Sequence, residues 1–410
     1  MRYSKIMPWM IWLLAVLFFA YQFILRLSPG LMMNDIMKKF DVDASDYGYF
    51  ALMYYYGYAL MQIPIAILLD RYGPRVIISI CAFVCAVATL TFIYADQWIV
   101  VLLARFLIGA ASAVGFLGVS KIISMWFSSA EYGKMVGLSF TFGLIGAVFG
   151  GRPISSLLDI FGWHDVLFYV ALVSALIGVL IIIFVRNPKN FVAAADGDVV
   201  HKLKTVCTDY RVLVIALASL LLVGPLEGFA DVWGITYLMK AYSITKPEAA
   251  SLTSFIFIGM IFGGPILSYI AQKYKAYYQL TFLCGVLMFA LFIFLIVARE
   301  YISFYTSMTI MFVIGVCCCY QVLVLTIGSF ILPAAFTGVT VAFLNCINML
   351  GGSFFHMFIG RTLDFLWTNQ TENGIRVYDL ESYSIAISIV PLFCLIGGFL
   401  FLLVKNKSRA

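Results

Sequence analysis

Long apolar runs alternate with short polar segments along most of this chain. A run of about 20 apolar residues is the length at which an α-helix crosses a lipid bilayer. The regular alternation and turn spacing of a membrane barrel are missing, so helices are the predicted spanning elements. The predicted spans are residues 7–27, 47–69, 76–95, 98–120, 133–157, 166–185, 212–238, 249–270, 278–298, 302–325, 337–362 and 384–404.

A polar gap divides these twelve spans into two sets of six. The segment in the gap is rich in Asp, Lys and Gly, which is typical of a linker. The sequence therefore predicts an all-α membrane protein with an N-terminal six-helix bundle over 1–187, a cytoplasmic linker over 188–211 and a C-terminal six-helix bundle over 212–410.

Composition agrees with a protein whose solvent is mostly lipid. Hydrophobic residues make up 63% of the chain and charged residues only 11%, which excludes an ordinary water-soluble domain. The net charge of +6 is scattered and forms no basic stripe, so no nucleic-acid partner is expected. The nine cysteines show no metal-binding or redox spacing. We therefore expect them to be small apolar fillers, with no metal site and no cofactor.

Charged residues predict the orientation in the membrane. Most of the 26 Lys and Arg residues fall on the side of the two termini, whereas acids such as Asp35, Asp41, Asp379 and Glu381 fall on the other side. Because positive charge marks the cytoplasmic side, both termini are predicted to be cytoplasmic.

The N-terminus has a basic start, Arg2 and Lys5, followed by an apolar run, as a signal peptide does. It lacks a small-residue cleavage site, so the first run is predicted to be a transmembrane helix. The compact loops favour a multi-pass protein of a bacterial inner membrane, and we expect a monomer.

The two halves contain similar sequences at similar offsets. "AILLDRYGPR" (Ala66 to Arg75) follows span 2, and "SYIAQKYKAY" (Ser268 to Tyr277) follows span 8. A second pair of similar sequences stands at the ends of spans 5 and 11. The first is "SLLDIFGW", which contains Asp159, and the second is "RTLDFLW", which contains Asp364. Two similar offsets favour duplicated six-helix units in parallel orientation, an arrangement known in secondary transporters whose substrate site lies between the halves.

With these motifs the chain resembles the major facilitator superfamily over essentially its whole length. The family's G-x-x-x-D-R/K-x-G-x-R signature is matched by Asp70, Arg71, Gly73 and Arg75, with alanine where the first glycine is usual. "RFLIGAASA" in span 4 is similar to the family's R-x-x-x-G pattern, and "GFADVWGITYL" to a bacterial permease-type branch. "GLIGAVFGGRP" in span 5 resembles the antiporter motif but lacks its proline, which weakens a drug-antiporter assignment.

The resemblance implies that the 70–75 loop is a cytoplasmic gate. In the family, the Asp and Arg of this loop hold the two bundles together when the protein opens outward. Gly73 could adopt a positive φ in so tight a turn, and Pro74 could begin the next helix. The alternative is that the basic residues only anchor the cytoplasmic side.

Four cations lie in or near spans of the N-terminal half: Arg26, Arg105, Lys121 and Arg152. Arg105 is the deepest, and a charge at that depth usually faces a partner or a wet cavity. It could bind substrate or relay protons, or it could form a structural pair with a polar group of span 1 such as Gln22. Lys121 could line the cavity or snorkel to the interface. Arg26 and Arg152 could be interfacial or lie at the mouth of an outward-open cavity.

Other polar side chains in the spans could form hydrogen bonds between helices or supply a polar site between the halves. His356 could carry a proton or be a satisfied structural histidine. The set comprises Tyr21, Gln22, Tyr54, Tyr58, Gln62, Gln321, Asn345, Asn348 and His356.

Two carboxylates inside span 7 are the strongest functional signal. In "GPLEGFADVWG", Glu227 and Asp231 are four residues apart and so share one face of an α-helix. Two ionised acids this close in an apolar medium would repel each other. We therefore expect Glu227, and Asp231 unless it reaches outside water, to bind a proton or a substrate cation.

Taken together, the sequence predicts a secondary transporter that moves a small polar solute, zwitterionic or anionic, by alternating access. No G-x-x-x-x-G-K-[ST] sequence is present, so an ion gradient would supply the energy, with H⁺ as the coupling ion. The alternative is efflux of amphipathic drugs. A non-transporting membrane sensor is less favoured because no soluble input domain is found, and no catalytic constellation supports an enzyme.

Overall fold

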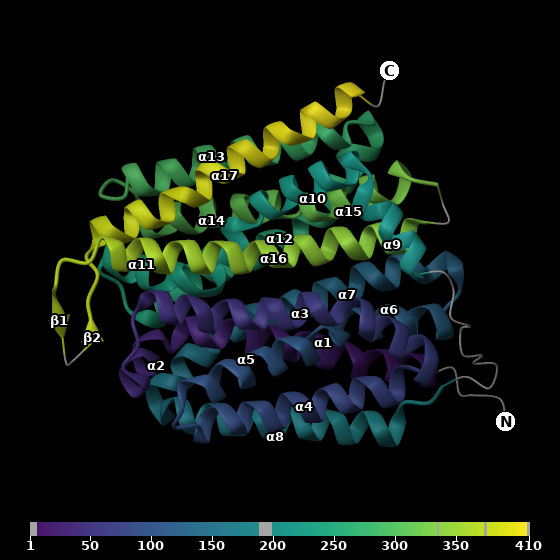
Figure 1. Ribbon diagram of the computed structural model, residues 1–410, viewed down its shortest axis with the longest axis horizontal. Coiled ribbons are helices and arrows are strands. Elements are labelled where there is room, and N and C mark those ends of the chain that lie inside the picture. The colour runs from purple at the N-terminus through teal and green to yellow at the C-terminus, as the bar shows by residue number, and fades with distance from the viewer. Residues whose placement is uncertain (1–5, 188–198, 334–335, 373–374, 408–410) are drawn as a thin grey trace. The chain divides into compact units, whose positions relative to one another are not determined.

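The computed structural model describes residues 6–187, 199–333, 336–372 and 375–407. Arg2, Lys5 and residues 188–198 of the predicted linker lie outside the described residues. The chain divides into two compact units, and long helices run alongside one another within each (Figure 1). The structure is nearly all helical, as predicted.

The first unit contains Met1–Ser28 and Met53–Gly197. It holds the larger parts of α1 (Met7–Leu31) and α3 (Ala44–Tyr72). Its other helices are α4 (Pro74–Tyr94), α5 (Trp98–Ser112), α6 (Val114–Trp126), α7 (Ser129–Gly150) and α8 (Arg152–Phe184).

The second unit contains Pro29–Leu52 and Asp198–Ala410. Its first helices are α2 (Met33–Phe40), α9 (Val199–Thr208), α10 (Tyr210–Leu222), the π-helix η1 (Gly224–Trp233), α11 (Gly234–Tyr242) and α12 (Lys246–Tyr274). They are followed by α13 (Tyr277–Val297), α14 (Phe304–Cys318), α15 (Tyr320–Ile331), α16 (Thr337–Phe365) and α17 (Leu380–Lys407).

Four elements lie where the sequence predicted only connections. Helix α2 follows the first span, and α9 lies inside the predicted linker. Between α16 and α17, the two short strands β1 (Thr371–Glu372) and β2 (Ile375–Arg376) pair antiparallel. In addition, residues 29–52, which the sequence assigns to the first half, cluster with the helices of the second half.

Eleven helical stretches of the described residues are long and apolar enough to cross a membrane. One of them, Glu131–Phe184, has 54 residues. A helix of that length would measure about 80 Å, more than twice the hydrocarbon thickness of a bilayer. The chain leaves helical geometry inside this stretch at Gly162, whose φ is 77°. The stretch therefore has the length and the break that two crossings require.

Backbone contacts between helices repeat in the two units. In the first, a Cβ on Gly57 of α3 would lie 2.1 Å from the carbonyl oxygen of Phe106 on α5. In the second, a Cβ on Gly259 of α12 would lie 2.1 Å from the carbonyl oxygen of Phe312 on α14. Only glycine allows so close an approach of two helices. Gly57 and Gly259 differ by the same offset as the repeated loop sequences, so the internal repeat extends to packing.

Asp209 begins the first membrane helix of the second unit. Its side chain accepts hydrogen bonds from the backbone N–H groups of Arg211 and Val212, which caps α10. The Arg211 guanidinium also donates to the Asp209 carboxylate at 2.8 Å. This hydrogen bond with Arg211 holds the pKa of Asp209 below its usual value.

Replacing Asp209 with alanine is expected to lower the free energy of unfolding by about 1 kcal/mol, because the capped N–H groups lose their acceptor. Asp209→Asn keeps an acceptor and should cost less. The pKa of Asp209 is lower in the folded protein than in the unfolded chain. The stabilisation by its carboxylate is therefore complete at neutral pH and is lost as the pH falls through the folded-state pKa of Asp209. Thermal unfolding of the detergent-purified variants measures this, and an alanine variant as stable as the parent would contradict it.

Candidate functional site

The two carboxylates of span 7 lie in a π-helix, which sequence analysis did not predict. Helix η1 continues α10 into α11, and its ten residues are all buried. Pro225, near its start, has no N–H to donate to an α-helical hydrogen bond. Glu227 is 0% exposed and Asp231 is 1% exposed. π-Helical turns are rare and occur often at functional sites. The backbone conformation and the two buried acids therefore indicate the same segment as a candidate site.

Helix α16 packs closely against the acid-bearing helix. A Cβ on Gly224 would lie 2.7 Å from the Phe355 ring, and one on Gly228 would lie 2.8 Å from the Phe355 Cβ. Both glycines therefore make room for Phe355. His356, the next residue, is fully buried on the same helix.

A hydrogen-bonded cluster joins α10, α15 and α16 in the second unit. The Ser219 hydroxyl donates to Asn348 Oδ1 at 2.7 Å. The Tyr320 hydroxyl lies 2.9 Å from the Ser219 carbonyl oxygen and 3.1 Å from Asn348 Oδ1. Tyr320 also interacts electrostatically with Glu227. The predicted residue Asn348 thus lies in a polar cluster that includes Tyr320.

Ser219 and Tyr320 were not among the predicted site residues. Tyr320 is a fully buried polar aromatic in mid-span, and that depth was the only signal in the sequence. Two other predicted residues, Gln321 on α15 and Asn345 on α16, are half-buried.

In the first unit, Arg105 binds the backbone of α1. Its guanidinium donates to the carbonyl oxygens of Leu25 at 2.7 Å and Arg26 at 3.0 Å. Leu25 would normally accept a hydrogen bond from the residue four positions on, but that residue is Pro29, which has no N–H. The guanidinium also lies 4.6 Å from the Tyr54 ring centroid. These contacts agree with a structural partner in span 1, here the backbone carbonyls of Leu25 and Arg26, and the substrate or proton role of Arg105 stays a prediction.

The other polar residues of α1 and α3 gather around Tyr54. Its hydroxyl donates to Gln22 Oε1 at 2.8 Å, and its ring stacks on Tyr58. The Arg26 guanidinium lies 5.3 Å from the Tyr55 ring centroid and is buried. The first unit therefore brings together Gln22, Arg26, Tyr54 and Tyr58, a cation with several hydrogen-bonding groups.

Three predicted residues of the first unit lie elsewhere. Tyr21 donates its hydroxyl hydrogen to the carbonyl oxygen of Val170 on α8, at 2.9 Å. Gln62 is buried further along α3. Arg152 is exposed where α8 begins.

The predicted gate loop forms a turn with specific partners. Asp70 Oδ1 lies 2.6 Å from Lys121 Nζ, so two predicted residues form one ion pair. Arg75 Nε donates to the carbonyl oxygen of Ile182 at 2.9 Å, and Arg71 lies over the Tyr72 ring. Gly73 has a φ of 81° and precedes Pro74 at the start of α4, the conformation expected for the turn.

Comparison with known families gives the identity of the fold. The sequence profile described as Major Facilitator Superfamily matches residues 11–356. The chain belongs to this superfamily. Its described residues include eleven helical stretches that are long and apolar enough to cross a membrane, and the relatives that it matches are named as transporters.

Two relatives show the range of similarity. A probable galactarate/D-glucarate transporter of Bacillus subtilis is 25% identical over 182 residues, covering 43% of this chain and 40% of the relative. A probable galactarate/D-glucarate transporter of Escherichia coli is 23% identical over 299 residues, covering 64% of this chain and 66% of the relative. The alignments thus span less than two thirds of either relative.

Solved superfamily structures share the fold. A bacterial homolog of the human lysosomal transporter Spinster aligns with a TM-score of 0.76 at 17% identity, covering 98% of each chain. A nucleoside transporter aligns with a TM-score of 0.77 at 15% identity, covering 97% of this chain and 99% of its own.

Arg105→Leu is expected to lower the free energy of unfolding by about 2 kcal/mol, because the buried Leu25 and Arg26 carbonyls lose a charged donor. Arg105→Lys should recover part of the loss, since one ammonium group can reach one carbonyl. Thermal unfolding in detergent measures both.

Arg152→Leu is the matched control, because Arg152 is an exposed arginine at a helix start, and its unfolding temperature should not change. An Arg105→Leu protein with the parent's stability but no solute binding would contradict the structural role and assign Arg105 to the substrate.

Proposed function

We propose that this chain is a secondary active transporter that carries a small carboxylate-bearing solute across the bacterial cytoplasmic membrane. It works by alternating access and couples solute movement to H⁺. The observation that carries the proposal is the pair of fully buried acids, Glu227 and Asp231, in a π-helical segment of a membrane span.

Coupling to protons follows from the burial of these acids. An ionised carboxylate in an apolar interior is costly, and binding a proton removes the charge. A carboxyl that must alternate between neutral and charged forms as it meets water on either side is a proton carrier. Tyr320, which belongs to the hydrogen-bonded cluster with Ser219 and Asn348, interacts electrostatically with Glu227. These properties support Glu227 as the proton site, with Asp231 as its partner.

A carboxylate-bearing solute suits the polar groups of the first unit. Arg26 supplies a buried cation, and Gln22, Tyr54 and Tyr58 supply hydrogen-bonding groups around it. An arginine can bind a carboxylate through two parallel hydrogen bonds. Relatives named for galactarate and D-glucarate, and another named for sulfoacetate, take small organic anions. The buried Arg26 cation and the names of the relatives both favour an anionic solute over a zwitterionic one.

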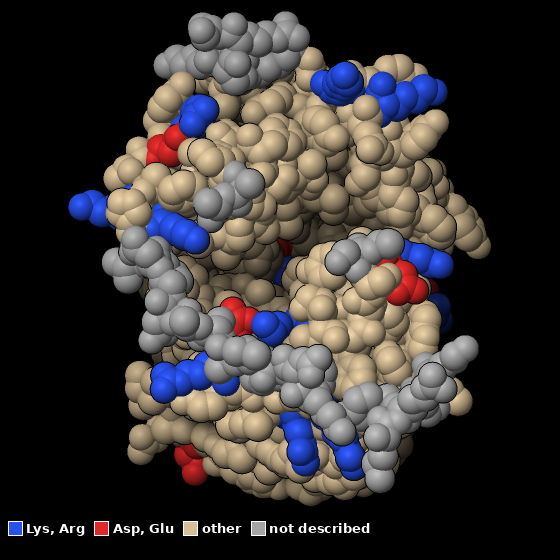
Figure 2. Space-filling model, turned by 90° about the vertical axis from the view of Figure 1, so that its right-hand side faces the viewer, with Lys and Arg blue, Asp and Glu red and all other residues tan. Residues whose placement is uncertain are grey.

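The proposed topology has twelve crossings with both termini in the cytoplasm. The broken stretch Glu131–Phe184 supplies two of them. Lys and Arg dominate the charged side chains visible in Figure 2. In the sequence, most Lys and Arg residues fall in the segments on the side of the two termini, and the positive-inside rule assigns that side to the cytoplasm.

Glu227→Gln is expected to abolish solute accumulation driven by a pH gradient while leaving exchange of solute across the membrane intact, because the amide cannot take up or release the proton. The measurement is uptake of a panel of small carboxylates, galactarate and D-glucarate among them, into proteoliposomes with and without an imposed gradient. Counterflow in the same vesicles measures exchange.

Glu300→Gln, which alters an exposed loop acid, is the matched control and should accumulate solute like the parent. Accumulation by Glu227→Gln with the parent's pH dependence would refute the proton role. Failure of the folded parent to move any solute of the panel would refute the proposed substrate class.

A further inference from the structure

The beginning of α3 is bound by side chains from the far end of the sequence. Its first N–H groups have no partner within the helix, as at every helix start. The Ala44 N–H donates to the Tyr378 hydroxyl at 3.1 Å, and the Ser45 N–H donates to Asp364 Oδ2 at 2.6 Å. The Asp46 N–H donates to Asp43 Oδ1 at 3.0 Å. Carboxylates are favoured here, because the helix dipole places positive charge at its N-terminus.

Arg376 ties the two carboxylates together. Its Nη1 lies 3.3 Å from Asp43 Oδ2 and 3.3 Å from Asp364 Oδ1. The guanidinium lies 4.3 Å from the Trp367 ring centroid, and the Tyr378 hydroxyl donates to Asp364. Burial raises the pKa of Asp43, and repulsion from Asp364 adds to it. Arg376 offsets that repulsion. We name Asp43, Asp364, Arg376 and Tyr378 the outer clasp.

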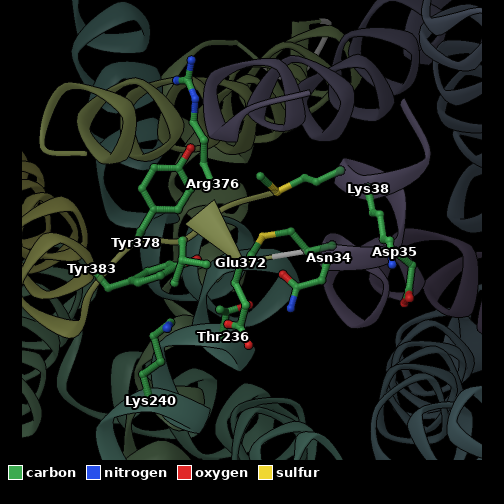
Figure 3. Close-up of a pocket in the computed structure, with 12 residues that line it drawn as sticks. Asn34, Asp35, Lys38, Thr236, Lys240, Glu372, Arg376, Tyr378 and Tyr383 are labelled. Carbon is green, nitrogen blue, oxygen red and sulfur yellow. The ribbon is translucent and has the colours of Figure 1, made fainter. Parts of the chain in front are cut away.

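The β1–β2 hairpin positions the clasp. Antiparallel pairing of Thr371 with Arg376 turns the chain back toward the end of α16, so that Arg376 and Tyr378 reach Asp364. The clasp residues Arg376 and Tyr378 also line a pocket of about 310 Å³, together with Lys38 and Lys240. Figure 3 shows Arg376 extending away from this pocket and Lys240 reaching toward it.

Below the clasp, α3 and α16 meet along an antiparallel seam with almost no space. A Cβ on Gly360 would lie 2.4 Å from the Ala44 carbonyl oxygen, and one on Gly48 would lie 2.6 Å from the His356 carbonyl oxygen. One turn further, the Ser353 hydroxyl donates to the Leu52 carbonyl oxygen at 3.4 Å. The small residues of this seam can separate without breaking strong bonds. The outer clasp therefore controls whether α3 and α16 stay in contact.

We propose that the outer clasp is a latch that holds α3 against α16 when the transporter is closed at this end, and that Asp364 is the residue that sets this equilibrium. The proposal rests on the alternating-access function proposed above. Asp364 contacts the helix start at Ser45, the hairpin residue Arg376 and the Tyr378 hydroxyl, so loss of its charge weakens three contacts of the latch at once. The three charged side chains of the clasp, Asp43, Asp364 and Arg376, are partly exposed to water, which allows their release during the cycle.

The test uses Asp364→Asn in a protein that carries Ser353→Cys as a reporter. Ser353 is 4% exposed, so the seam shields a cysteine there while it is closed. The rate of labelling by a membrane-impermeant maleimide, in intact cells and in inside-out vesicles, measures opening at each side. Asp364→Asn should label about tenfold faster than the reporter protein alone, the change expected when one charged hydrogen bond is lost. The chain without the reporter corrects for native cysteines.

Two variants serve as matched controls. Asp159→Asn changes the counterpart of Asp364 in the internal repeat, an exposed acid on α8, and Glu372→Gln changes an exposed acid of the hairpin itself. Both should label at the rate of the reporter protein. Asp364→Glu restores the charge and should return the rate toward that value, which a purely steric role for Asp364 would not produce.

A folded Asp364→Asn protein that labels at the rate of the reporter protein would overturn the latch. If Asp364→Asn does not fold, Tyr378→Phe replaces it, since it removes only the hydroxyl that contacts Ala44 and Asp364; unchanged labelling of that variant also overturns the latch. Because labelling needs no solute, faster labelling without transport supports the latch and counts against the proposed function. Transport by the parent together with unchanged labelling of Asp364→Asn would support the proposed function and overturn the latch.

Discussion

A backbone group inside a membrane must find its hydrogen-bond partner within the protein. Where a membrane helix is interrupted, a side chain must therefore bind the open N–H or C=O group, or the backbone must change its hydrogen-bond pattern. At Pro29, the freed Leu25 carbonyl is bound by Arg105. At the beginning of α3, Asp364 and Tyr378 bind the open N–H groups. At Pro225, the backbone itself changes to a π-helix. Three buried or partly buried charged residues, Arg105, Asp364 and Glu227, lie at these breaks.

The sequence was informative where the determinant is local. Hydropathy located the spans, because a run such as 76–95 carries its own signal, and the loop at Gly73 forms the turn that its residues require. The depth of Arg105 and Glu227 in apolar runs identified both as buried charges. The repeated loops also anticipated an internal repeat, which the Gly57 and Gly259 contacts extend to packing.

What the sequence could not supply was pairing over long distances. Tyr320 meets Ser219 across 101 positions, and Ser45 meets Asp364 across 319. No local pattern encodes such contacts, because they depend on how helices pack. The π-helix was also missed, since Pro225 alone does not distinguish a kink from a π-helix. The role of Arg105 depended on which carbonyl Pro29 leaves open, and that requires the two helices to be placed side by side.

Coupling to H⁺ requires Glu227 to be a protonatable carboxyl inside the membrane. Infrared difference spectroscopy of the purified protein during a pH titration tests it without knowledge of the solute. We expect a carbonyl band of a buried protonated carboxyl that titrates in the parent and is absent from the Glu227→Gln protein. A band that is unchanged by that substitution, or a parent protein without such a band, would contradict the proton role of Glu227.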